Sequence, residues 1–270
     1  MSVPHDPSDN HKVHQAHFFD EEVDPEFEIS RPHGSPLMYS WMMEEKFRRS
    51  VSAIDSMLPG ALALTVCGGS GMDAEFVARS GARVISSDLS FRAVRRAQER
   101  ARRYGFPLML IVADVEHLPF GGESVEMAYV HDGLHHLPRP DVGLREMARV
   151  SSDAVIVTEP ARAILTRLAV AVGLAREVED AGNRVERLEL EDVKRFLEAV
   201  SFQIVSAQRY GMYYRHKPGF AAKLASLPIV FPCLKAALKM ANVMLGRWGN
   251  KLTVAARRAN HPTHPPLSDV

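Results

Sequence analysis

Several features that would place this chain in a specialised class of protein are scarce in its sequence. Only two of its 270 residues are cysteines, Cys67 and Cys233. This excludes a disulfide framework and favours a reducing compartment, so we expect a cytoplasmic location. The 33 basic and 33 acidic residues cancel to a net charge of zero. Because no overall charge draws the chain to polyanions, we expect no nucleic-acid partner.

Long apolar runs are also missing. No stretch has the roughly 18 uninterrupted apolar residues of a membrane-spanning helix. Residues 1–15 are polar, without the apolar region of a secretory signal. Two shorter apolar runs, 163–175 and 224–234, are interrupted by Arg167 and by two prolines. Contact with a membrane surface through 218–248 therefore stays open as a lesser alternative.

Residues 61–88 combine an apolar run, a glycine cluster, a helix, a second apolar run and an acid. The cluster reads Cys67-Gly68-Gly69-Ser70-Gly71, and Asp88 follows the second apolar run. Glycines let the backbone approach a ligand, and the N-terminus of the next helix presents unpaired N–H groups. An acid at the end of the second strand can accept hydrogen bonds from ribose hydroxyls. The pattern therefore predicts a nucleotide-type pocket.

Apolar content and strand spacing predict the fold class. With 46% apolar residues the chain can bury a sizeable core. Continuous apolar strands that alternate with helices indicate a parallel sheet covered on both faces. We expect an α/β, Rossmann-like, doubly wound and mostly parallel seven-stranded sheet. Its strands are predicted near 62–67, 83–87, 108–113, 125–131, 153–158, 202–210 and 251–256, with helices near 72–80, 91–104, 139–149 and 188–200.

The expected organisation surrounds this core with helical segments. In order it comprises a disordered tail (1–14), an N-terminal helical lid (15–60), the cofactor-binding core (61–160), a helical insertion (161–187), completion of the core (188–258, with a helical insertion at 218–248) and a disordered tail (259–270). Four histidines, His5, His11, His14 and His17, crowd the N-terminal region. They are interpreted as part of a flexible polar segment, and no metal site is predicted.

Two later segments narrow the choice of ligand. Asp114, followed by Val115-Glu116-His117-Leu118-Pro119-Phe120, comes after the third strand, and Leu134-His135-His136-Leu137 comes after the fourth. Together with the glycine turn and Asp88, this set resembles class I S-adenosylmethionine-dependent methyltransferases, in particular the small-molecule type 11 group, over roughly 62–160. A dehydrogenase that binds NAD through the glycine turn would leave Asp114 and the histidine segment unexplained.

The resemblance implies S-adenosyl-L-methionine as cofactor and S-adenosyl-L-homocysteine as product. The glycine turn would approach the methionine part, Asp88 the ribose and Asp114 the adenine amino group, while His131 would lie near the sulfonium and the substrate. The implied cofactor-binding residues are Cys67, Gly68, Gly69, Gly71, Asp88, Leu89, Asp114, Val115 and His131. Two positions depart from the family pattern: Thr65 stands where an acid is frequent, and Cys67 replaces the first glycine.

The expected activity is methylation of a small molecule, foremost O-methylation of a natural product, sugar or lipid-like acceptor. A hydroxyl acceptor must lose a proton, and histidine suits that role. The candidate bases are His135 and His136, with His131 as a third. Asp73 lies in the first turn of a helix, where a carboxylate favours the helix dipole, so no catalytic role is expected for it. The acceptor atom could instead be nitrogen or carbon, and a non-catalytic cofactor-binding module also stays open. The oligomeric state is left open.

Overall fold

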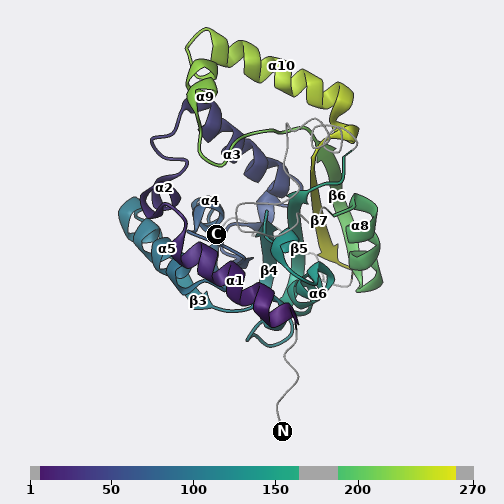
Figure 1. Cartoon of the computed structure of the whole chain (residues 1–270). Helices are drawn as coiled ribbons and strands as arrows, with labels where there is room; N and C mark the ends of the chain where they lie inside the picture. Colours follow the sequence, from purple (N-terminus) through teal and green to yellow (C-terminus); the bar gives the residue numbers. More distant parts are fainter. Residues whose placement is uncertain (1–6, 164–187, 260–270) are drawn as a thin grey trace, which may run out of the picture.

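A seven-stranded sheet runs through the computed structural model, which describes residues 7–163 and 188–259 (Figure 1). The strands are β1 (Leu62–Val66), β2 (Arg83–Asp88), β3 (Met109–Val112), β4 (Val125–His131), β5 (Ser151–Pro160), β6 (Phe202–Tyr210) and β7 (Lys251–Arg258). Their order across the sheet is β3-β2-β1-β4-β5-β7-β6. The first five strands pair in parallel, and β7 is antiparallel to β5 and β6. The predicted Rossmann-like, mostly parallel sheet is confirmed.

Helices cover both faces of the sheet, and alternate residues of each strand enter the two cores. On one face Ala128 and Val130 of β4 pack with α6 (Pro140–Val150) and α8 (Leu190–Ala199). On the other face Met127 and Tyr129 pack with α3 (Leu37–Val51) and α4 (Met72–Arg79). Both side-chain sets of a strand are thus buried, which explains why the strands read as continuous apolar runs.

Local signals in the sequence mark the ends of several helices. Gly71, with φ of 81°, precedes α4 and turns the chain out of the glycine cluster. At α5 (Phe91–Tyr104) the Ser90 hydroxyl accepts a hydrogen bond from the N–H of Ala93 at 2.9 Å. The same helix ends at Gly105 in the left-handed conformation. Asp24 caps α2 (Pro25–Ser30) in the same way as Ser90 caps α5.

The N-terminal region differs from the sequence-based expectation. Residues 7–14 were expected to belong to a disordered tail, but they form the first half of α1 (Pro7–Glu21). α1 has no apolar stripe that periodicity could detect, and polar contacts hold it against the loops of the sheet. Within the region expected to form the N-terminal helical lid (15–60), α3 ends at Val51, and a short 3-10 helix, η1 (Asp55–Met57), follows it.

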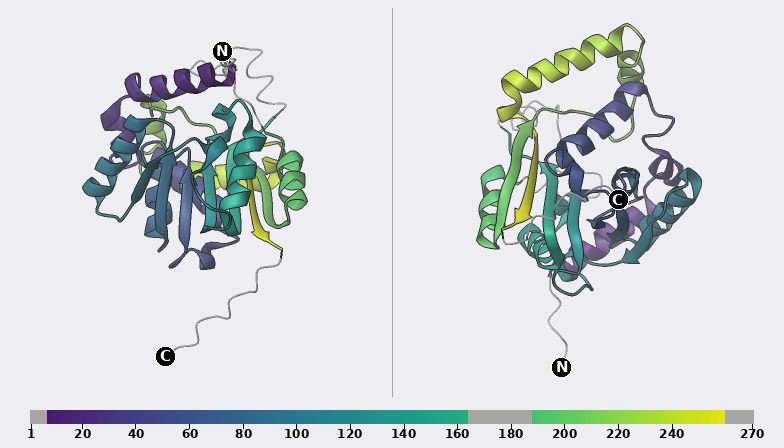
Figure 2. Two further views of the ribbon diagram at one scale, coloured as in Figure 1. Left: turned by 90° about the horizontal axis from the view of Figure 1, so that it is seen from below. Right: turned by 180° about the vertical axis from the view of Figure 1, so that it is seen from behind.

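The remaining helical elements include three short 3-10 turns, η2 (Val115–His117), η3 (Leu134–His136) and η4 (Gly246–Trp248). The segment between β6 and β7 contains α9 (Phe220–Ala225) and α10 (Val230–Leu245), in agreement with the predicted helices at 218–248. α10 lies beside α3 and away from the sheet (Figure 2, right). Most of the insertion expected at 161–187 and nearly all of the tail expected at 259–270 lie outside the described residues.

Within residues 7–163 and 188–259, no helix combines the length and the apolar content needed to cross a bilayer.

Candidate active site

The loops that follow β1 to β4 line one cavity at the carboxyl edge of the sheet. Its volume is about 1100 Å³, and its wall also includes residues of α1 and α3 and the segment 212–217. The strand order reverses at this point, because β2 and β3 extend to one side of β1 while β4 and β5 extend to the other. Ligands of open α/β sheets bind at such a switch point.

The glycine turn brings bare backbone to the cavity wall. Gly69 has φ of 51°, and a Cβ added to it would meet no atom within 4 Å. A Cβ on Gly68 would lie 2.2 Å from Oγ of Ser86, so the turn packs tightly against β2. Gly71 does not reach the wall. A Cβ there would lie 3.0 Å from Cβ of Ala97, so this glycine allows close packing of α4 against α5.

Asp88 is fixed at the end of β2 by backbone donors. Its Oδ2 accepts a hydrogen bond from the N–H of Gly69 and its Oδ1 accepts one from the N–H of Ser90, both at 2.8 Å. Burial raises the pKa of this carboxyl above its ordinary value. Asp88 and Leu89 both line the cavity. The predicted pair of glycine turn and acid is therefore brought together.

Asp114 and Val115 also line the cavity, at the end of β3. The ammonium group of Lys12 lies 2.6 Å from Oδ2 of Asp114 and 2.6 Å from Oε2 of Glu116. Burial would raise the pKa of Asp114, but the hydrogen bonds from Lys12 and from the N–H of Glu116, together with the charge of Lys12, lower it below its ordinary value. Asp114, Glu116 and His117 bring possible metal-ligand atoms within 4.8 Å of one another. Lys12 already supplies the positive charge between the two carboxylates.

α1 lies across the ends of the strands beside this part of the cavity (Figure 2, left). Oδ1 of Asp20 accepts hydrogen bonds from the Ser90 hydroxyl at 2.5 Å and from the N–H of Arg92 at 2.9 Å. The guanidinium group of Arg96 donates to the carbonyl oxygen of Phe19 at 2.7 Å. Polar contacts from α5 thus hold α1 over the cavity.

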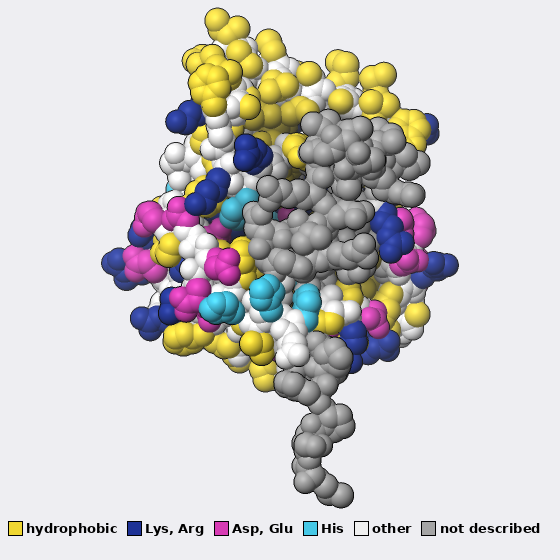
Figure 3. Space-filling view, viewed as in Figure 1, with side chains coloured by type: hydrophobic (Ala, Val, Ile, Leu, Met, Phe, Trp, Pro, Cys, Tyr) yellow, Lys and Arg dark blue, Asp and Glu magenta, His cyan; other side chains and the backbone are white. Residues whose placement is uncertain are grey.

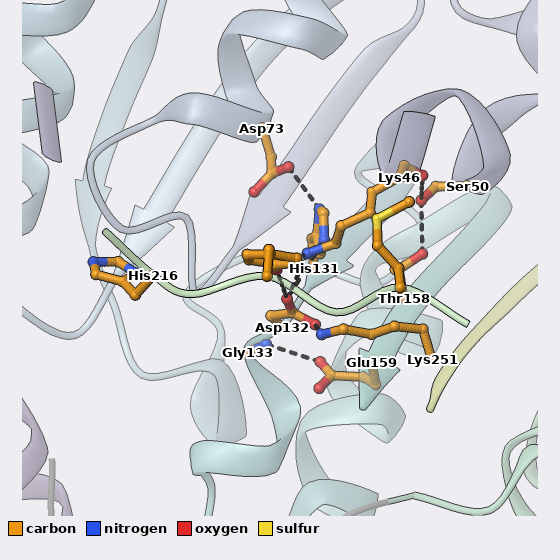
Figure 4. A network of polar contacts seen from close by, with 12 residues as sticks. Lys46, Ser50, Asp73, His131, Asp132, Gly133, Thr158, Glu159, His216 and Lys251 are labelled. Atoms are coloured by element: carbon orange, nitrogen blue, oxygen red, sulfur yellow. Dashed lines mark hydrogen bonds and ion pairs between the residues drawn. The ribbon is translucent and has the colours of Figure 1, made fainter. Parts of the chain in front are cut away.

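His131 and Asp73 form a close pair on the opposite side of the glycine turn. Nδ1 of His131 lies 2.7 Å from Oδ1 of Asp73 (Figure 4). The other ring nitrogen, Nε2, is buried and lies 3.7 Å from Oδ2 of Asp132, but it has no hydrogen-bond partner among the described residues. Both side chains line the cavity. Burial would raise the pKa of Asp73, but the charge of His131 and their hydrogen bond lower it. Asp73 is therefore more than a helix-dipole residue.

Asp132 is the centre of a charged cluster next to His131. Its carboxylate lies 2.6 Å from the ammonium group of Lys46 and 2.7 Å from that of Lys251 (Figure 4). The hydroxyl of Tyr214 donates to Asp132 at 3.1 Å. Burial would raise the pKa of Asp132, yet Lys251 and Lys46 hold it well below its ordinary value.

The sequence offered a signal for one of these lysines. Lys46 comes three residues after Met43 and directly before Phe47, on the apolar side of α3. A charge at such a position is expected to have a partner.

Glu159 organises the loop that contains the two neighbouring histidines. Its Oε1 accepts hydrogen bonds from the N–H groups of Gly133 at 2.9 Å and Leu134 at 2.7 Å. Its Oε2 lies 2.7 Å from Nδ1 of His135, which is buried. The ring of His136 packs against Phe19 of α1, with ring centroids 5.7 Å apart. His135 and His136 both line the cavity, as expected.

The two positions that depart from the family pattern are explained by packing. Thr65 is buried behind Gly68 and does not line the cavity, so its hydroxyl offers no direct contact to a ligand there. Cys67 adopts a left-handed backbone with φ of 50°. Burial, together with Asp88, raises the pKa of its thiol well above the ordinary value. Cys67 is thus a small packing residue at the cavity wall and is poorly suited to act as a nucleophile.

The cavity fits the cofactor that the sequence suggested. Bare backbone at Gly69, a fixed carboxylate at Asp88 and a second carboxylate at Asp114 line one end of it. The unpartnered Nε2 of His131 and the Asp132 cluster line the other end. The backbone and carboxylates at the first end suit an adenosine group, and the histidine and charged cluster at the second end suit a reacting centre. Both ends belong to the same cavity.

Comparison with known proteins agrees with this fold and these motifs. Residues 64–157 match the family model described as a methyltransferase domain. The chain is 34% identical over 105 residues to a demethylmenaquinone methyltransferase of Thermobifida fusca, covering 38% of this chain and 43% of that protein. It is 33% identical over 92 residues to an uncharacterised protein of Mycobacterium tuberculosis, covering 34% of each chain. The chain thus spans less than half the length of these curated relatives.

Two solved structures share the fold over most of the chain. One is magnesium protoporphyrin IX methyltransferase of Synechocystis with bound S-adenosylhomocysteine, with a TM-score of 0.61, 18% identity and coverage of 92% of this chain and 99% of that one. The other is the [4+2]-cyclase SpnF, with a TM-score of 0.56, 22% identity and coverage of 88% and 85%. Residues 64–157 therefore match the model of the methyltransferase domain family, and the chain shares the fold of these two solved structures over most of its length.

Proposed function

We propose that this protein is an S-adenosylmethionine-dependent methyltransferase that methylates a hydroxyl oxygen of a small molecule. The observation that carries this proposal is the His131–Asp73 pair. Its second ring nitrogen, Nε2 of His131, is buried in the wall of the cavity and makes no hydrogen bond to any described residue. A buried imidazole nitrogen without a partner costs free energy. A role in binding or deprotonating a ligand accounts for that cost.

The residues at the adenosine end have binding roles under this proposal. Asp88 accepts hydrogen bonds from the ribose hydroxyls, since the backbone N–H groups of Gly69 and Ser90 already fix its orientation. Asp114 accepts from the adenine amino group and Val115 lines the adenine slot. Lys12 and Phe19 of α1 close this end of the cavity and exclude water. When bound, S-adenosylmethionine supplies a methyl group activated by a positively charged sulfur.

The residues at the other end have chemical roles. Nε2 of His131 accepts the proton of the acceptor hydroxyl, while Asp73 orients the ring and stabilises the imidazolium that forms. Of the three histidines proposed from the sequence, His131 is favoured by this geometry. His135 instead positions the loop through Glu159, whose other oxygen binds two backbone N–H groups.

The acceptor is a medium-sized molecule with a polar end and an apolar part. Its polar end lies near Asp132, Lys46 and Lys251, which can exchange hydrogen bonds with hydroxyl or carbonyl groups. Its apolar part contacts Met43 and Met212. These surroundings suit the expected classes, namely a natural product, a sugar derivative or a lipid-like molecule.

A panel of hydroxylated acceptors, assayed with isotopically labelled cofactor, tests the proposal. With a positive acceptor, His131→Asn should lower kcat at least about 100-fold, because a general base contributes roughly 10²–10⁴-fold. The affinity for S-adenosylhomocysteine should stay within about threefold. His135→Asn is the matched control. It removes the contact between His135 and Glu159 and should therefore lower thermal stability. Unchanged turnover in the His131 variant would contradict the proposed base, and a methylated nitrogen or carbon in the product would contradict the proposed acceptor atom.

A second candidate function is a reaction without methyl transfer. It is favoured by the likeness to the [4+2]-cyclase, which shows the same fold under another activity, and by Thr65, which cannot offer the usual carboxylate. Tight binding of S-adenosylmethionine with no label transferred to any acceptor would favour this alternative.

A further inference from the structure

Among the described residues, α9 and α10 expose a large apolar surface. α10 has 16 residues, and all are apolar except Pro232, Lys235, Lys239 and Asn242. Neither α9 nor α10 contains a buried residue. A helix that is apolar on all sides is usually enclosed by protein or lipid.

The two faces of α10 have different surroundings. Phe231, Leu234 and Leu238 recur at three and four residues and pack towards α3, as part of the cluster that contains Met38 and Met42. The opposite side, which we name the outer face, consists of Ile229, Met240, Val243 and Met244. Ile229 is 84% exposed and Val243 is 87% exposed. Apolar side chains cover the surface over α9 and α10 (Figure 3).

The charged residues of α9, α10 and η4 are all basic. The sequence has no acidic residue between Glu198 and Asp269, while α9, α10 and η4 carry Lys223, Lys235, Lys239 and Arg247. Apolar side chains flanked only by cations match an anionic lipid surface. A symmetric contact between two copies would instead bring like charges together, which opposes association.

We propose that the outer face of α10, together with α9, docks this protein on an anionic membrane surface. Ile229, Met240, Val243 and Met244 enter the boundary between headgroups and acyl chains, and the flanking lysines contact lipid phosphates. α10 lies in the plane of the interface.

Docking would also orient the cavity. The segment 212–217 forms part of the cavity wall and leads within a few residues into α9 at Phe220. Tyr213 in this segment is 70% exposed. The docked protein would thus hold one wall of its cavity beside the lipid surface, where an apolar molecule can enter. The docking itself does not depend on methyl transfer.

Co-sedimentation of the whole chain with vesicles tests the proposal. Vesicles of phosphatidylcholine with roughly 30–40% phosphatidylglycerol have a strong negative surface potential, so the protein should sediment with them. With vesicles of pure phosphatidylcholine, the sedimented fraction of the protein should be at least about tenfold smaller. The triple variant Met240→Gln, Val243→Gln, Met244→Gln should lower the partition coefficient at least about tenfold, since buried apolar area supports interfacial binding. Glutamine keeps the helix propensity high.

Two matched controls separate the outer face from other surfaces. Met109→Gln with Val205→Gln removes exposed apolar side chains from the two edge strands and should not change binding. Lys235→Glu with Lys239→Glu should abolish binding to anionic vesicles. Arg95→Glu with Arg102→Glu on α5 makes the same change in net charge and should leave most of the binding intact.

Three results would overturn the proposal. The first is equal sedimentation with and without anionic vesicles. The second is a dimer in sedimentation velocity that the triple variant dissociates, because a second copy would then cover the face. The third is a loss of thermal stability in the triple variant like that of a core substitution, because another part of the chain would then cover it.

Discussion

Nδ1 of His131, the last residue of β4, lies 2.7 Å from Oδ1 of Asp73 in the first turn of α4. The two residues are 58 positions apart in the chain. They meet because β1 and β4 are neighbours in the sheet and α4 starts from the turn after β1. The first turn of α4 and the end of β4 thus contribute one half each of an acid–imidazole pair in the cavity wall.

The first prediction concerns Asp73 as a positioning residue. Asp73→Asn keeps the size of the side chain but removes the charge that stabilises an imidazolium at His131. We expect kcat to fall about 10²-fold or more, while KM for the acceptor and the dissociation constant of S-adenosylhomocysteine change less than about threefold. Steady-state kinetics and calorimetry separate these quantities. A rise in KM at constant kcat would show that Asp73 serves binding only.

The second prediction concerns the cofactor end of the cavity. Gly69→Ala places a methyl group into open space at the cavity wall, at a backbone φ of 51°. The strain should cost about 1 kcal/mol of stability, and the affinity for S-adenosylhomocysteine should fall at least tenfold (about 1.4 kcal/mol). Gly60→Ala is the control, since Gly60 also has a positive φ and open space around it but lies two residues before β1 and does not line the cavity. Equal affinities in the two variants would remove the turn from the binding site.

The third prediction concerns Asp88. Asp88→Ala removes the carboxylate that the Gly69 and Ser90 N–H groups hold. Calorimetry should show at least about tenfold weaker cofactor binding, as expected when a charged hydrogen-bond acceptor is lost. An unaltered affinity would exclude Asp88 from contact with the ribose.

The fourth prediction concerns acid sensitivity at Glu28, which is buried and lies 3.1 Å from Arg31 and 2.8 Å from His216. Burial would raise its pKa, but Arg31 and His216 lower it from 4.5 to about 2. Because the folded-state pKa is depressed, the stability from Glu28 is fully present above about pH 4.5 and is lost as pH falls towards 2. The shift corresponds to about 3 kcal/mol.

Urea unfolding of the wild type and of Glu28→Gln between pH 6.5 and 2.5 checks this. The difference in unfolding free energy should shrink as the pH falls. A constant difference would show that packing alone makes Glu28 important.

The fifth prediction concerns the buried cluster around Asp132. Asp132→Asn leaves the ammonium groups of Lys46 and Lys251 without their shared carboxylate. This should lower the free energy of unfolding by roughly 3–5 kcal/mol. Asp153→Asn breaks a pair whose cation, Arg257, is 30% exposed, against 2% for Lys46 and 10% for Lys251. This change should lower the unfolding free energy by about 1 kcal/mol or less. Chemical denaturation compares the two. Similar losses would mean that Lys46 and Lys251 find other partners.

The sequence predicted the sheet well because strands buried on both faces leave short apolar runs, as at 62–64 and 127–130. It also predicted that Asp88 and Asp114 lie at the same edge of the sheet. Asp88 is the last residue of β2, and Asp114 lies two residues after the end of β3. These positions depend on local pattern alone.

The missed features depend on contacts between distant segments. Lys46 is 86 positions from Asp132, and Lys251 is 119 positions from it. Residues 7–14 were misassigned because α1 carries no apolar stripe, and one ion-pair partner, Asp114, lies 102 positions beyond Lys12. Periodicity reports burial within an element, so it cannot register partners that only the folded chain brings together.

The contact between Cys67 and Gly133 couples the glycine turn to the loop after β4. A Cβ on Gly133 would lie 2.4 Å from Cβ of Cys67 and 3.1 Å from a methyl group of Val130. The two positions together thus have room for only one Cβ. In this chain that Cβ belongs to Cys67, which replaces the first glycine of the pattern described above. Among relatives the two positions should therefore covary, with alanine at 133 tolerated only beside glycine at 67. Gly133→Ala should be damaging alone and largely rescued by Cys67→Gly.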